Sequence, residues 1–211
     1  MELIKYLNEH FFTKQELLDI SKVTEQDFLK YQENGAMPKC SYKLSLNLTS
    51  DSYFGLHSNE QEIEYFAKGY SSWLAIIQSL KSAESVYLIF SERYKNAIKN
   101  LKEKGHSSSN PKITSGLNGH IKEEWPHFLN GTYGLCTQSG LPEDIAAKEL
   151  SILEINELSE FNELSPEQIK KLTLAVNLLD SASSLFAPHE RLKSSRHRLV
   201  NEVRRKHKLQ S

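Results

Sequence analysis

Apolar residues recur at intervals of three and four along most of this chain, and that spacing predicts helices. It places apolar side chains on one face of a helix, which then packs against a neighbour. Six stretches are predicted to be helical: 60–80, 84–104, 121–129, 142–157, 165–187 and 188–207. We therefore expect a mainly α-helical fold, a multi-helix bundle of seven or eight helices whose apolar stripes form the core.

Two further, shorter helices are predicted near the N-terminus from their capping residues. Thr13 and Glu16 form a Thr-x-x-Glu capping box, and Thr24 caps a second helix after a short turn. Gly35 is placed to end that helix in the left-handed conformation. Two short helices joined in this way form a helix-turn-helix. We expect residues 1–40 to form this unit, packed on the helical body.

The remaining chain, 41–211, is expected to be one helical domain with two interruptions. Residues 42–49 alternate apolar and polar positions, a strand pattern, so we expect at most a short strand or hairpin there. An irregular connection is predicted over 51–59. Ser, Gly, Asn and Pro dominate 105–119, which predicts a flexible loop. The sequence leaves open whether this loop is a lid over a site or a hinge.

Several residues of the N-terminal helix pair follow a known pattern. They are Phe12-Thr13, Glu16-Leu17, Val23-Thr24, Tyr31, Gly35 and Pro38. Together they resemble the opening helix-turn-helix of MerR-type winged-helix regulators, a family whose second helix lies in the DNA major groove. Residues 13–39, however, carry four lysines, five carboxylates and no arginine. Because duplex binding depends on Lys and Arg at the phosphates, we expect a structural or protein-contacting unit that does not bind duplex DNA.

The stretch Trp125–Glu149 concentrates residues with chemical potential between two predicted helices. It holds one of the two Trp, one of the two Cys and three of the nine Gly. Its turn, 131–140, leads into a helix at Pro142 whose first turn carries acidic residues, as the helix dipole favours. We expect a rigid turn that faces the basic C-terminal helix and is the best place for a ligand.

The residues Gly-Thr-Tyr-Gly-Leu-Cys at 131–136 resemble the turn that opens the zinc knuckle of DksA/TraR-type RNA-polymerase-binding proteins. Ser139 stands where the second cysteine ligand belongs, and no later cysteine pair follows. A structural zinc ion needs four ligands, so neither the metal nor the polymerase-binding role carries over. Nucleotide-binding motifs are also absent from the sequence. We expect no cofactor and no metal site.

A second resemblance spans nearly the full length. It rests on 131–136, on 142–149 with its Pro-Glu-x-Ile-Ala-x-Lys-Glu pattern, on 186–191 and on the region of Trp73. These positions resemble an uncharacterised bacterial family, a domain of unknown function, whose label associates it with natural-product biosynthesis. The resemblance implies a family but no mechanism.

Charge is unevenly distributed along the chain. The net charge is −1, but residues 189–211 carry eight basic and two acidic residues, which leaves −7 on 1–188. The basic segment either packs against the acidic body or binds an external anion. Cys40 and Cys136 are predicted to be free thiols in the cytoplasm, with a single disulfide as the alternative. No apolar run is long enough to span a membrane, and no signal peptide is recognised.

These observations define the candidate site residues. They are Trp125, His127, Thr132, Tyr133, Cys136, Glu143, Lys148, Glu149, His189, Arg191 and Arg196. Cys136 is a candidate nucleophile, with His120, His127 or His189 as its base, and a buried inert thiol is the alternative. The two arginines form either an anion-binding edge or ion pairs with Glu143 or Glu149.

The leading functional hypothesis is therefore a bacterial accessory or regulatory protein that binds a partner or a small anionic ligand. The first alternative is a MerR-like DNA-binding transcriptional regulator. The second is an enzyme that uses Cys136 or a His/Glu pair. The sequence decides neither whether the protein is an enzyme nor its oligomeric state.

Overall fold

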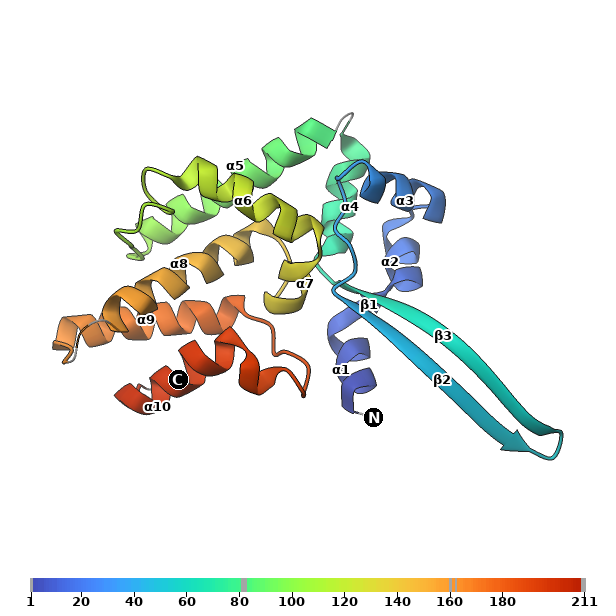
Figure 1. The fold of residues 1–211 in the computed structure, drawn as a ribbon. Coiled ribbons are helices and arrows are strands. Elements are labelled where there is room, and N and C mark those ends of the chain that lie inside the picture. The colour runs from blue at the N-terminus through green and yellow to red at the C-terminus, as the bar shows by residue number, and fades with distance from the viewer. Residues whose placement is uncertain (1, 81–82, 160, 162, 210–211) are drawn as a thin grey trace.

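The computed structural model describes residues 2–80, 83–159, 161 and 163–209, and it has two connected parts (Figure 1). The N-terminal part comprises α1 (Glu2–His10), β1 (Phe11–Thr13), α2 (Lys14–Ser21), α3 (Glu25–Glu33), β2 (Tyr42–Ser52) and β3 (Gly55–Ala67). The helical body comprises α4 (Tyr70–Ser79), α5 (Ala83–Glu103), α6 (Leu117–Leu129), α7 (Thr132–Cys136), α8 (Pro142–Ser159), α9 (Pro166–Ala182) and α10 (Glu202–His207), with short 3-10 and π turns before α10. Within the described part of the chain, none of the helices combines the length and apolarity that a membrane crossing requires.

The prediction of a mainly α protein with at most a short strand or hairpin near 42–49 is wrong about the sheet. The chain is 61% helical, but 14% lies in a three-stranded antiparallel sheet in the order β1-β3-β2. The β2–β3 hairpin pairs from Tyr42 with Tyr65 to Ser52 with Gly55 and projects away from the body (Figure 1). Its outer half is solvent-exposed on both faces, so it lacks the apolar alternation that marks a half-buried strand.

The predicted helix over 60–80 is in fact a strand followed by a helix. Ile63 and Phe66 belong to β3, while Trp73 and Ile77 belong to α4. Their spacing imitates one helical stripe because the strand and the helix bury side chains in the same region, with Phe66 and Trp73 in one core cluster. The two elements meet at Gly69, where an added Cβ would collide with the chain near Ser139.

The capping signals at the N-terminus are confirmed. Thr13 and Glu16 form the reciprocal capping box of α2, and the Thr24 hydroxyl accepts the backbone N–H of Asp27 at the start of α3. Gly35 has a φ of +63° at the end of α3. These contacts are made by neighbours in sequence, which is why the sequence alone locates them.

One hydrophobic cluster joins the two parts around α4. Phe28 of α3 and Phe66 of β3 lie in the same cluster as Trp73, Phe90 and Phe128 of the body. The Trp73 ring meets Phe128 edge to face at 5.0 Å, and its indole Nε1–H donates to the carbonyl of Ala36 at 3.0 Å. These contacts therefore pack the N-terminal part against the helical body.

The segment 105–116 is held against α8 rather than loosely connected. The backbone N–H of Ser107 donates to Glu154 at 2.7 Å, and that of Ser109 donates to Glu157 at 3.1 Å. His106 Nδ1 lies 2.9 Å from the same Glu154 carboxylate. Carboxylates of α8 therefore satisfy backbone donors of a segment that has no regular structure.

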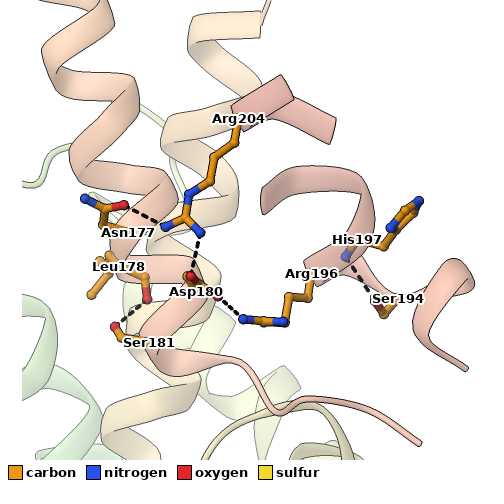
Figure 2. A network of polar contacts seen from close by, with 8 residues as sticks. All are labelled: Asn177, Leu178, Asp180, Ser181, Ser194, Arg196, His197 and Arg204. Carbon is orange, nitrogen blue, oxygen red and sulfur yellow. Dashed lines mark hydrogen bonds and ion pairs between the residues drawn. The ribbon is translucent and has the colours of Figure 1, made fainter. Parts of the chain in front are cut away.

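The predicted single helix over 188–207 is broken into shorter turns. Ser194 has an extended backbone, and its hydroxyl accepts the N–H of His197 at the start of a π turn. Two arginines of this region converge on Asp180 of α9: Arg196, and Arg204 at 2.7 Å (Figure 2). Part of the basic C-terminal charge is thus neutralised within the chain.

Candidate functional site

The central turn between α6 and α8 brings the N-terminal part and the body together. Gly131 has a φ of +78°, and a Cβ there would lie 2.6 Å from the carbonyl oxygens of both Lys39 and Cys40. The backbone N–H of Lys39 donates to the carbonyl of Leu129 at 2.8 Å. At Gly140, with a φ of +77°, a Cβ would lie 2.7 Å from the Tyr70 ring. Glycine is required here because the N-terminal part packs directly on the backbone of the turn.

On the body side of the same turn, Tyr133 belongs to a group of buried polar side chains. Its hydroxyl donates to the carboxylate of Glu124 on α6. One turn earlier on α6, His120 Nδ1 lies 3.4 Å from Glu124 Oε1, because residues four apart share a helix face. Glu149 of α8 completes the set, in which ligand atoms of His120, Glu124 and Glu149 all lie within 4.8 Å of one another.

A fifth side chain, Tyr94 of α5, borders this group. Its ring meets the ring of His120 edge to face, with 6.2 Å between centroids. Elements α5, α6, α7 and α8 therefore each contribute at least one side chain. We call the five residues Tyr94, His120, Glu124, Tyr133 and Glu149 the buried polar centre.

The buried polar centre is largely shielded from solvent, with Glu149 partly exposed, and it is incompletely hydrogen-bonded. His120 exposes 3% of its surface and Tyr94 none. Within the part of the chain that the structure describes, three polar atoms of the centre have no hydrogen-bond partner: both ring nitrogens of His120 and the hydroxyl of Tyr94. Buried polar groups are normally paired, so this arrangement needs an explanation.

Burial also changes the protonation of the centre. It raises the pKa of the Glu149 carboxyl, and the neighbouring Glu124 raises it further, against an opposing effect of Lys148. Burial lowers the pKa of His120, although Glu124 opposes this, so the imidazole is neutral at neutral pH. The pKa of Tyr133 is raised, first by burial and then by Glu149. The phenol therefore stays protonated and donates its hydrogen bond.

The basic residues Lys148, Lys112 and His127 act on Glu149 electrostatically. Among the described residues, no Lys or Arg forms an ion pair with Glu124 or Glu149. The adjacent Lys148 instead donates its Nζ to the carbonyl of Cys136 at 2.8 Å, and it lies over the Phe186 ring. One neutral imidazole and two carboxylates remain, which are the side-chain types that hold divalent metal ions.

Of the residues that the sequence nominated, Tyr133 and Glu149 lie in the buried polar centre and Lys148 lies beside it. Cys136 is half-buried, and burial raises the pKa of its thiol above the usual range. In the described residues no histidine donates to or accepts from this thiol. Such a thiol is poorly suited to act as a nucleophile. Both cysteines are free.

The other nominated residues lie elsewhere and have local partners. Glu143 forms a two-pronged ion pair with Arg93, with both distances 2.7 Å. Arg196 binds Asp180, and Arg191 donates its Nε to the Phe186 carbonyl at 3.2 Å. The predicted ion pairs of these arginines with Glu143 or Glu149 are therefore not formed. Trp125 stacks on Phe128 at 5.4 Å, and the remaining side chains, those of His127, Thr132 and His189, are exposed.

Three members of the centre were missed as ligand-site residues from the sequence, namely Tyr94, His120 and Glu124. The sequence suggests His120 only as a possible base for Cys136, together with His127 and His189. The structure buries His120 and leaves His127 exposed. The available signal was the His-x-x-x-Glu spacing of 120 and 124, which places both side chains on one helix face. Nothing local links them to Glu149, which approaches from another helix.

The comparisons with known proteins bear on the helical body. Residues 86–208 match a family of unknown function, DUF6058. This range contains all five residues of the buried polar centre and excludes the β2–β3 hairpin. No curated protein and no solved structure matches the chain.

Proposed function

We propose that this chain, which belongs to the DUF6058 family of unknown function, is an accessory or regulatory protein with two linked parts. In this proposal the N-terminal part contacts a partner protein, and the buried polar centre of the body holds a small ligand. The observation that carries the proposal is the shared turn. Tyr133 belongs to the centre, while Gly131 of the same turn packs against Lys39 and Cys40 of the N-terminal part.

The order of elements in the N-terminal part supports a role in contacting other macromolecules. Helix, strand, two helices and a hairpin follow one another, and β1 pairs with β3 to give the sheet order β1-β3-β2. That order agrees with the resemblance to winged-helix regulators, with α2 and α3 as the helix-turn-helix and the β2–β3 hairpin as the wing. In DNA-binding members of such folds the second helix enters the major groove.

Charge favours a protein partner over duplex DNA. Residues 2–67 contain six lysines, no arginine and eleven carboxylates. Three of these lysines are already paired, Lys14 with Glu25 at 2.6 Å, Lys43 with Glu62 at 2.8 Å and Lys30 with Asp27 at 3.6 Å. Glu33 adds a carboxylate at the end of α3. An acidic surface repels phosphates and attracts a basic protein surface.

We therefore expect no binding to duplex DNA even at low ionic strength. Fluorescence anisotropy with mixed-sequence duplexes in 50 mM salt would measure this, because phosphate contacts are strongest there. As a matched control, the double variant Glu25→Lys and Glu33→Lys should acquire weak, salt-sensitive binding. Binding by the unmodified protein with a steep salt dependence would instead support the alternative, a MerR-like DNA-binding regulator.

The link between the two parts can be tested at the turn. Tyr133→Phe removes the hydrogen bond to Glu124, and we expect hydrogen exchange of the Lys39 amide to accelerate by about tenfold, which corresponds to ~1.4 kcal/mol. This amide donates to the Leu129 carbonyl, so its exchange rate reports on the packing of the N-terminal part against the turn. Tyr94→Phe is the matched control, because Tyr94 borders the same centre from α5 but lies outside the turn. Equal exchange rates in the two variants would contradict the link.

The proposal includes a cytoplasmic, biosynthetic setting and no catalytic step. The cytoplasmic setting is based on the two free cysteines. The biosynthetic setting is based on the resemblance to a bacterial family whose label associates it with natural-product biosynthesis. A gene neighbourhood without biosynthetic enzymes would count against it. Catalysis by Cys136 is not part of the proposal because burial raises the pKa of the thiol.

A further inference from the structure

We infer that the buried polar centre binds one divalent transition-metal ion, with His120, Glu124 and Glu149 as its protein ligands. This names the ligand that the proposed function leaves open, and it rests on that function for the idea that the centre is occupied. The inference combines the geometry of three ligand groups with unpartnered buried polar atoms beside them.

The three ligand groups are close to the spacing that one ion requires. Zinc binds imidazole nitrogen and carboxylate oxygen at about 2.0–2.2 Å, so two ligands of a tetrahedral ion lie ~3.4 Å apart. His120 Nδ1 and Glu124 Oε1 are separated by 3.4 Å. The ligand atoms of the full set lie within 4.8 Å of one another, so shifts on the order of 1 Å bring all three to the spacing of one ion.

The unpartnered atoms provide the second, independent observation. His120 is 3% exposed, and neither of its ring nitrogens has a hydrogen-bond partner among the described residues. A metal ion on Nδ1 gives this nitrogen the partner that it lacks. Both nitrogens are shielded from solvent. The hydroxyl of Tyr94, also buried and unpartnered, is available to donate to a ligand carboxylate.

The surrounding side chains have the orientation that supports metal ligands. Carboxylates that bind metals are usually held by hydrogen bonds from neighbouring groups. Tyr133 supplies such a bond to Glu124. Lys148, the nearest ammonium group in sequence, is held away by the Cys136 carbonyl at 2.8 Å. The negative charge of the carboxylates is therefore left for an external cation.

The ligand types indicate which cations fit. An imidazole together with two carboxylates suits Mn²⁺, Fe²⁺ or Zn²⁺, whereas Mg²⁺ and Ca²⁺ prefer oxygen ligands only and Cu⁺ prefers sulfur. Three protein ligands leave at least one coordination position open, as in zinc sites that also bind water or a substrate group. The centre can therefore present the bound ion to a further small ligand.

The test is direct metal binding to the full chain after treatment with a chelator. We expect one equivalent of Mn²⁺ or Zn²⁺ to bind in calorimetry and to raise the melting temperature, with Mg²⁺ at least tenfold weaker. Glu124→Gln and Glu149→Gln should each weaken binding by at least tenfold. Glu123→Gln is the matched control, because Glu123 is the exposed neighbour of Glu124 on α6, and it should bind like the unmodified chain.

A spectroscopic readout keeps the test independent of how the variants fold. Co²⁺ added to the unmodified chain should produce visible absorption bands, and Mn²⁺ should show magnetic coupling to one imidazole nitrogen. Failure of Mn²⁺, Fe²⁺ and Zn²⁺ to bind would overturn the inference. So would binding that is unchanged in both Gln variants, or a Mn²⁺ spectrum without nitrogen coupling.

The metal inference and the proposed function fail separately. If no metal binds but Tyr133→Phe still accelerates exchange of the Lys39 amide, the link through the turn stands and the ligand is of another kind. If metal binds and exchange at Lys39 is the same with and without it, the metal site stands and the regulatory link fails.

Discussion

Replacing Gly131 by alanine is expected to destabilise the protein by about 3 kcal/mol or more. The left-handed backbone at this residue, with a φ of +78°, costs an L-residue ~1–2 kcal/mol. The new Cβ would also lie 2.6 Å from the carbonyl oxygens of Lys39 and Cys40. Both obstacles are backbone atoms, so a side-chain rotation cannot relieve the clash, and the N-terminal part must move away from the turn. Urea unfolding followed by circular dichroism would measure the loss.

Gly119→Ala is the matched control for this prediction. Gly119 lies inside α6 with nothing within 4 Å of an added Cβ. Alanine there should stabilise the helix by up to ~1 kcal/mol, because glycine is a poor helix former. The same substitution is thus expected to lower the free energy of unfolding at one site and to raise it at another, 12 residues away. If Gly131→Ala lowers the free energy of unfolding by less than about 1 kcal/mol, the packing of the N-terminal part on the turn adapts more easily than these contacts indicate.

Trp73→Ala is expected to cost about 3–5 kcal/mol, the range for removing a large aromatic side chain from a core. Trp73 is fully buried and contacts Phe128 of the body. Its indole N–H also donates to the Ala36 carbonyl, directly after α3. The substitution therefore removes packing inside the body and a tie to the N-terminal part at once. Thermal or denaturant unfolding of the purified variant would give the magnitude.

Trp73→Phe separates these two effects. Phenylalanine keeps most of the apolar contact but cannot donate to Ala36, which leaves a buried carbonyl without that partner. We expect a loss of ~1–3 kcal/mol, together with faster exchange of amides in α3 than in α8. If Trp73→Ala unfolds at the same denaturant concentration as the unmodified protein, Trp73 does not join the two parts in the way its contacts indicate.

The structure gives the central turn a different role from the one that its residues suggested. Its aromatic, cysteine and glycine content pointed to a reactive site. In the folded chain Gly131 packs closely against Lys39 and Cys40, Gly140 packs closely against Tyr70, and the thiol of Cys136 has a raised pKa. The reactive groups instead gather on the body side of the turn, where Tyr133 meets Glu124. The turn therefore lies between the N-terminal part and the candidate ligand site.

The basic C-terminal region is similarly explained by tertiary contacts. Arg196 and Arg204 both bind Asp180, and Arg204 also donates to Asn177 at 2.8 Å (Figure 2). An Arg–Asp–Arg arrangement fixes the end of the chain on α9 and leaves less charge for an external anion. The buried polar centre, in contrast, holds two carboxyl groups and no lysine or arginine. For this reason the ligand that we infer is a cation, whereas the sequence favoured a small anion.

The sequence by itself determined the features that depend on near neighbours. The capping box of Thr13 and Glu16, the left-handed Gly35 and the start of α9 at Ser165 are all present as predicted. Each depends on contacts within about four residues. Helices α5, α6, α8 and α9 follow from apolar spacing because a helix needs one continuous apolar face to pack. The same spacing wrongly merged α4 with β3 and did not reveal α7.

Tertiary structure alone decided the sheet and the centre. The β2–β3 hairpin is held by backbone pairing between strands rather than by a buried apolar face. Its outer end is exposed, including the apolar side chains of Tyr53, Phe54 and Leu56, so burial imposes no strand pattern there. The buried polar centre joins His120 and Glu124 to Glu149, which lies 25 residues beyond Glu124 on another helix. Sequence spacing reports only residues that share an element, whereas this site is created by the packing of α5, α6, α7 and α8.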